Sequence, residues 1–76
     1  MDEAVEKLAN AIIIQAVKDY RRVYRAFLKN PSEYNKKEVE RNEAFFHSSW
    51  YRTLTGLDGD LLLNKVRQME EEKGVI

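Results

Sequence analysis

The sequence contains no cysteine, one proline and three glycines in 76 residues. Without cysteine the chain can form neither a disulfide nor a thiolate metal site, which fits a reducing compartment. Long apolar runs are also missing, and the run at residues 11–14 is far below the ~20 residues of a membrane-spanning helix. The amino terminus lacks the basic start and apolar core of a signal peptide. We therefore expect a cytoplasmic protein.

An excess of charge of either sign is absent as well. The formal net charge is zero, with 13 basic and 13 acidic residues. A nucleic-acid-binding domain usually has a marked basic excess, and a mimic of nucleic acid needs a marked acidic one. The composition, 43% hydrophobic and 34% charged, is typical of an ordered globular chain. Its length predicts a single domain over residues 1–76.

What the sequence does contain is a long uninterrupted helical pattern. Neither glycine nor proline occurs in residues 3–29, which predicts one helix of roughly 40 Å. A compact domain of this length has a diameter of roughly 30 Å, so about two helical turns should overhang.

The apolar arc of this helix is nearly twice as wide as the ~100° that a helix on a single core needs. We expect part of it to be covered by a second copy of the chain, in a homodimer, or by a target protein. The alternative is that the later helices fold back along the whole rod. The residues predicted for self-association are Val5, Leu8, Ile12, Ile13 and Val17.

A basic stripe lies opposite the apolar arc at helical spacing. It fits contact with an acidic protein surface or with a phosphate backbone. A solvated face that keeps the helix soluble explains it equally well. The residues predicted for partner binding are Lys18, Arg21, Arg22, Arg25 and Lys29.

Three shorter helices are predicted after residue 30. Asn30 and Pro31 predict a helical turn that leads into a helix over residues 36–47, antiparallel to the first. Ser49 predicts the cap of a short helix over residues 50–55. The fold class is thus all-α: a small helical bundle with one long N-terminal helix, an antiparallel second helix and two shorter C-terminal helices.

The ends of the last two helices have their own signals. Gly56 in a left-handed conformation is predicted to end the third helix. Asp58 is predicted to cap the fourth helix, which stops at Gly74. The acidic run at residues 70–72 predicts fraying, because negative charge is unfavourable at a helix carboxyl end.

Large apolar side chains predict the core. One set from the later helices is expected to face another set from the first helix. The expected core residues are Phe45, Phe46, Trp50, Leu54 and Leu57, opposite Tyr20, Val23, Tyr24 and Phe27.

Candidate catalytic chemistry is sparse. His47 is the only histidine, and adjacent Ser48 and Ser49 fit helix capping better than a nucleophile, which needs an oriented base and an oxyanion hole. Asp58 and Asp60 fit capping better than a calcium loop, which needs about five or more oxygen ligands. We expect a non-enzymatic protein with no cofactor and no metal site.

Three segments carry a resemblance to known proteins. They are residues 11–21 (AIIIQAVKDYR), residues 43–51 (EAFFHSSWY) and residues 54–62 (LTGLDGDLL). Their pattern resembles small accessory proteins of phages, prophages and mobile elements of Gram-positive bacteria. The resemblance brings no catalytic or ligand residue with it. It implies a protein that binds host machinery or blocks host defence, as anti-CRISPR inhibitors do.

These observations favour a non-enzymatic binding module, encoded by a phage or mobile element, that acts by stoichiometric contact with a host or defence protein. A first alternative is a small nucleic-acid-binding or regulatory protein that uses the basic stripe. A second alternative is a self-assembling structural protein.

Overall fold

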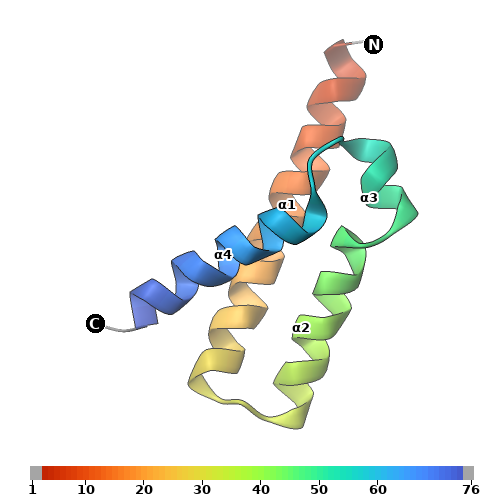
Figure 1. Ribbon diagram of the computed structural model, residues 1–76. Helices are drawn as coiled ribbons and strands as arrows, with labels where there is room; N and C mark the ends of the chain where they lie inside the picture. Colours follow the sequence, from red (N-terminus) through yellow and green to blue (C-terminus); the bar gives the residue numbers. More distant parts are fainter. Residues whose placement is uncertain (1–2, 75–76) are drawn as a thin grey trace.

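The computed structural model describes residues 3–74, which form four α-helices and no strand (Figure 1). The helices are α1 (Glu3–Lys29), α2 (Glu33–Phe46), α3 (Ser49–Leu54) and α4 (Gly59–Gly74). α1 and α2 run antiparallel, and α4 crosses the middle of α1 (Figure 1). The predicted all-α helical bundle is confirmed, and α1 has the predicted bounds.

Two helices begin earlier than predicted, because each is capped by a serine that is not the predicted cap residue. The Ser32 side chain, not that of Asn30, accepts a hydrogen bond from the Asn35 backbone N–H and starts α2. Ser48 caps α3 by accepting from the Tyr51 N–H. Both serines have the extended backbone that a cap residue adopts.

The start of α4 agrees with the prediction, whereas the end of α3 does not. The Asp58 carboxylate accepts hydrogen bonds from the backbone N–H groups of Asp60 and Leu61. The prediction of a left-handed Gly56 is wrong, because no described glycine has a positive φ. α3 instead ends at Leu54, and the extended backbone of the cap residue Thr55 (φ −156°) leads the chain out of the helix.

The core draws on all four helices and is rich in aromatic rings. Tyr20 is fully buried, and its ring lies 6.0 Å from that of Phe46, which lies 5.6 Å from Tyr51. The buried hydrophobic residues are Ile13, Tyr20, Tyr24, Val39, Phe46, Tyr51, Leu63 and Val66.

Two residues predicted for the core lie on the surface instead. Trp50 is 55% exposed and Leu57 is 63% exposed, so this part of the core prediction is wrong. α3 has only six residues and presents one face to the other helices. A step of 100° separates neighbouring residues, and it is Tyr51 rather than Trp50 that points inward.

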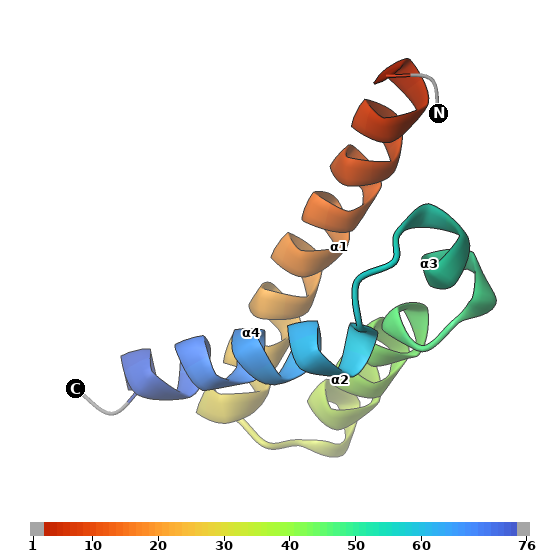
Figure 2. The same cartoon turned by 45° about the horizontal axis from the view of Figure 1, so that its top comes forward.

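The molecule is elongated because α1 is longer than its partners. It measures 42 × 25 × 17 Å, and its radius of gyration of 13.5 Å exceeds the ~11.4 Å typical of a domain of this length. The first turns of α1 project beyond the other helices (Figure 2). None of the helices within residues 3–74 combines the length and apolarity needed to cross a membrane.

Candidate protein-binding surface

A buried carboxylate joins α4 to α1. The Glu70 side chain is 1% exposed and accepts hydrogen bonds from Arg21 Nε (2.8 Å) and Arg25 Nε (3.0 Å). The two arginines are four residues apart, so they lie on one face of α1 and reach the same carboxylate. Hydrogen bonds from Arg25 and then Arg21 lower the pKa of Glu70 to about 2, although burial acts in the opposite direction.

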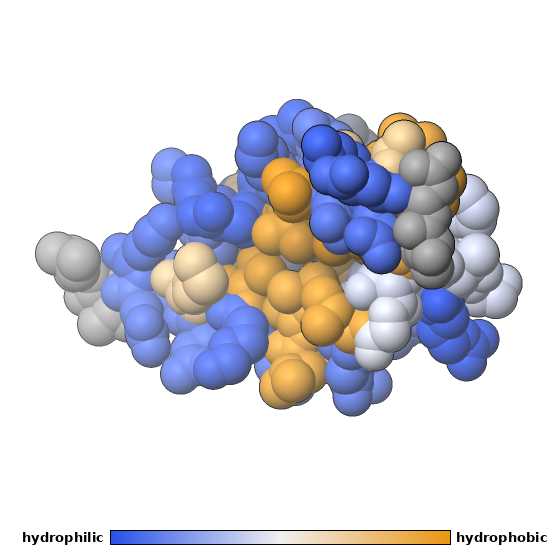
Figure 3. Space-filling model, turned by 90° about the horizontal axis from the view of Figure 1, so that it is seen from above, coloured by the Kyte–Doolittle hydropathy of each residue, from blue (hydrophilic) through white to orange (hydrophobic). Residues whose placement is uncertain are grey.

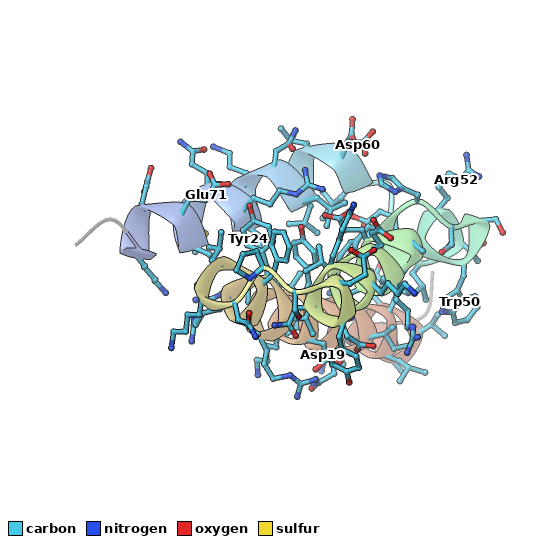
Figure 4. The ribbon with its side chains drawn as sticks, turned by 90° about the horizontal axis from the view of Figure 1, so that it is seen from below. Asp19, Tyr24, Trp50, Arg52, Asp60 and Glu71 are labelled. Carbon is cyan, nitrogen blue, oxygen red and sulfur yellow. The ribbon has the colours of Figure 1, made fainter. Side chains whose placement is uncertain are left out.

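This anchoring changes the expectation for the end of α4. The predicted fraying is not seen, since α4 continues as a helix to Gly74. The first carboxylate of the acidic run is neutralised by the arginines of α1, and the second accepts a hydrogen bond from α1. Tyr24 Oη donates to Glu71 Oε1 at 2.6 Å, and these two side chains face each other between the helices (Figure 4). Burial, and then this hydrogen bond, raises the pKa of Tyr24 to about 12.

A second polar cluster links three helices around Tyr20. Tyr20 Oη donates to Glu43 Oε2 of α2 at 2.6 Å and accepts from Arg67 Nε of α4 at 2.8 Å. Arg67 Nη2 also donates to Glu43 Oε2 at 2.6 Å. Burial, and then the hydrogen bond to Glu43, raises the pKa of the Tyr20 hydroxyl. The cluster holds α4 in place across α1 and α2.

These contacts divide the predicted basic stripe into two parts. Arg21 and Arg25 are engaged with Glu70, whereas Lys18, Arg22 and Lys29 are exposed. Arg22 lies 3.9 Å from the Asp19 carboxylate, and neither Lys18 nor Lys29 forms an ion pair with any residue from 3 to 74. The role of the stripe in partner binding stays a prediction.

The residues predicted for self-association also fall into two groups, exposed and buried. Val5 and Leu8 are 52% and 63% exposed on the projecting turns of α1. Ile12 and Val17 are partly buried, and Ile13 belongs to the core of its own chain. Ile13 is therefore not available to a second copy. We call Val5, Leu8 and Ile12 the tip face.

A second apolar surface lies between the amino-terminal half of α1 and the helix α4, which crosses it. We call it the corner patch. Three of its side chains are about half exposed, and two are partly buried against the core. Hydrophobic residues form a continuous area at the centre of this view, bordered by hydrophilic ones (Figure 3). The residues of the corner patch are Ile14, Val17, Leu61, Leu62 and Met69.

Sequence reasoning missed the corner patch. Ile14 looks isolated among basic residues when α1 is considered alone. The missing information is the position of α4, whose Leu62 and Met69 are seven residues apart and so lie on nearly one face. Their pattern predicts an apolar stripe, but not that half of that stripe stays open to solvent.

A cavity of about 540 Å³ lies where α2 ends and α4 begins. His47 Nε2 lies 2.5 Å from Asp60 Oδ1 in its lining, and the buried hydroxyl of Tyr51 has no hydrogen-bond partner among residues 3–74. Ser48 Oγ donates to the Phe45 carbonyl and accepts from the Tyr51 N–H, so it acts as a helix cap. Residues 3–74 contain no group of three histidine or acidic side chains placed to hold a metal ion.

Comparison with protein-family models, curated proteins and solved structures gives no match. Function is therefore inferred from the surface of this chain. Within residues 3–74, nine large hydrophobic side chains are exposed, against eight hydrophobic residues that are buried. Exposed hydrophobic residues that are scattered singly are ordinary, whereas a contiguous apolar patch marks a surface for interaction.

Proposed function

We propose that this protein is a non-enzymatic binding module that acts by stoichiometric contact with another protein. The observation that carries the proposal is the corner patch, a continuous exposed apolar area with charged borders (Figure 3). The resemblance to accessory proteins of phages and mobile elements favours a host or defence protein of a Gram-positive bacterium as the partner.

The patch is too small to support stable binding by apolar burial alone. Covering Ile14, Leu61 and Met69, each about half exposed, contributes on the order of 1 kcal/mol per side chain. Association costs an estimated 4–15 kcal/mol in lost translational and rotational freedom. The apolar patch thus needs further contacts around it, and the charged side chains at its border are placed to supply them.

Contact with nucleic acid fits this surface less well. A phosphate backbone offers nothing to cover the apolar side chains, and Arg21 and Arg25 already have a carboxylate partner. A gel shift at two salt concentrations separates the two functions, because binding to phosphates weakens steeply with salt. We expect no shift at low salt.

The proposal is tested by affinity capture from a Gram-positive bacterial lysate with quantitative mass spectrometry. The baits are the unmodified protein, the double variant Ile14→Glu/Met69→Glu, and Tyr34→Glu as a matched control. Tyr34 is 72% exposed on α2, away from the corner patch. We expect a protein that is captured by the unmodified bait and the control and lost with the double variant. Capture of the same proteins by all three baits would contradict the proposal.

A further inference from the structure

We propose that the corner patch is the receptor for an amphipathic helix of the partner protein, with acidic side chains on both edges of its apolar face. This inference rests on the proposed function and names the chemistry of the partner. It follows from the shape of the patch, from the charges on its borders and from the absence of any strand in residues 3–74.

The geometry selects a helix as the occupant. Two crossing helices contribute to the patch, with Ile14 and Val17 on α1 and Leu62 and Met69 on α4. A helix that lies on this surface contacts both segments through residues spaced three and four apart. An extended peptide that binds by strand addition would need an exposed strand edge, and the described part of the chain offers none.

The border of the patch is basic on both sides. Lys18 follows Ile14 by one turn along α1, and Lys65 lies between Leu61 and Met69 on α4, each four residues away. Both lysines are exposed, and neither has an ion-pair partner among the described residues. A bound helix would therefore have one lysine at each edge of its apolar face.

A third source of positive charge lies next to the patch. Arg21, Arg25 and Lys73 all lie within 4.0 Å of one carboxylate, that of Glu70, so this cluster retains an excess of positive charge. Two acids without an ion pair among the described residues flank the patch on α4: Asp58 lies four residues before Leu62, and Glu72 lies three residues after Met69. Together with Glu70 they are outnumbered by five basic side chains around the patch, Lys18, Arg21, Arg25, Lys65 and Lys73. The field over the patch thus favours an acidic ligand.

The test uses a displayed library of helical peptides of about five turns as the probe. Leucines form one face, and the positions flanking that face are drawn from glutamate, lysine and glutamine. Selection on the unmodified protein is expected to enrich glutamate on both flanks. In fluorescence anisotropy, Ile14→Gln/Met69→Gln is expected to weaken the affinity for the enriched peptide about tenfold or more, as the loss of a hot-spot residue does.

Charge reversal makes the test specific. In Lys18→Glu/Lys65→Glu, selection is expected to shift from glutamate to lysine flanks. The matched control Lys29→Glu/Lys37→Glu reverses two exposed lysines outside the patch and should keep the original preference. Circular dichroism is used to establish that every variant keeps the helical content of the unmodified protein.

Three results would overturn the inference. One is selection of no peptide, or of peptides without a flank preference. Another is peptide binding that is unchanged in Ile14→Gln/Met69→Gln and keeps the same flank preference in Lys18→Glu/Lys65→Glu. The third is occupation by a second copy, seen as a doubled molar mass that the Ile14→Gln/Met69→Gln change returns to one chain. If affinity capture still finds a partner that depends on Ile14 and Met69 but not on Lys18 and Lys65, the inference fails while the proposed function stands.

Discussion

At the scale of single residues, Glu70 is the side chain on which the position of α4 depends most directly. Its carboxylate is buried, and its hydrogen bonds come from two arginines of α1 that are themselves partly exposed. The pKa of Glu70 is lower in the folded chain than its ordinary value of 4.5. Glu70 therefore contributes stability above pH 4.5, and this contribution is lost as the pH falls through about 2.

We predict that Glu70→Gln destabilises the protein by about 2 kcal/mol at neutral pH, because hydrogen bonds to charged groups contribute about 1.5–3 kcal/mol. The variant should also lose less stability than the unmodified protein between neutral and strongly acidic pH. Urea unfolding over this pH range measures both effects. Glu72→Gln serves as the control, since Glu72 is exposed and has no ion pair with residues 3–74. Equal acid sensitivity in all three proteins would refute the prediction.

Tyr20 makes a different kind of contribution, because its hydroxyl completes a cluster that spans three helices. We predict that Tyr20→Phe costs about 1–2 kcal/mol, since Glu43 loses a donor and Arg67 an acceptor while the ring still fills the core. Thermal unfolding measures the loss. Tyr34→Phe changes a 72% exposed tyrosine in the same way and should have no effect. A cost no larger than that of the control would show that the cluster adds no net stability.

At the scale of helices, the close approach of α4 to α2 depends on a glycine. A Cβ atom added to Gly59 would lie 2.1 Å from the backbone carbonyl oxygen of Phe46. A backbone atom cannot move aside as the end of a side chain can, so α4 would have to shift. At Gly56, in contrast, an added Cβ atom would meet nothing within 4 Å.

We predict that Gly59→Ala destabilises the protein by about 1–3 kcal/mol, the usual cost of overpacking, and that Gly56→Ala is close to neutral. Chemical denaturation of the two variants, which differ only in where one methyl group is added, gives the comparison. Similar stabilities would mean that α4 can move away from α2 without loss.

Helical bounds were more predictable than helical packing for a physical reason. The extent of α1 follows from a local pattern, the lack of glycine and proline over residues 3–29, and Asp58 caps α4 as its chemistry predicts. The burial of Tyr51 in place of Trp50 depends on the angle at which α3 enters, which no local pattern specifies. The same holds for Glu70, whose arginine partners lie 45 and 49 residues away in the chain.

The predicted binding residues illustrate the same limit. The spacing of Lys18, Arg21 and Arg25 correctly places them along one side of α1, but it cannot show that two of them share the Glu70 carboxylate. The corner patch requires two helices at once, so only the folded chain reveals it. The exposure of Val5 and Leu8 follows from length alone, because α1 is longer than the helices that cover it.

At the scale of the whole molecule, the exposed area is larger than expected for a monomer. The accessible surface is 5662 Å², roughly 800 Å² above the ~4,850 Å² typical of a folded chain of this mass. One partner of a standard interface buries about 800 Å². Zero net charge also removes the repulsion that keeps many small proteins apart.

We therefore predict that the chain self-associates through the tip face. Light scattering at submillimolar concentration should give twice the molar mass of one chain, and Leu8→Glu should reduce it to that of one chain, because a charge cannot be buried unpaired in such a contact. Tyr34→Glu, which adds the same charge on α2, should leave the dimer intact. A single-chain mass for the unmodified protein at every concentration would exclude this dimer.

The tip face and the corner patch are also predicted to act independently. Val5 and Ile14 are nine residues apart, which at 100° per residue places them on opposite sides of α1. A dimer formed through the tip face leaves the corner patch open, so each copy can bind its own ligand. Leu8→Glu should then abolish the dimer without changing the affinity for the acidic helical peptide, as fluorescence anisotropy would measure. A loss of peptide binding in this variant would place both contacts on one surface.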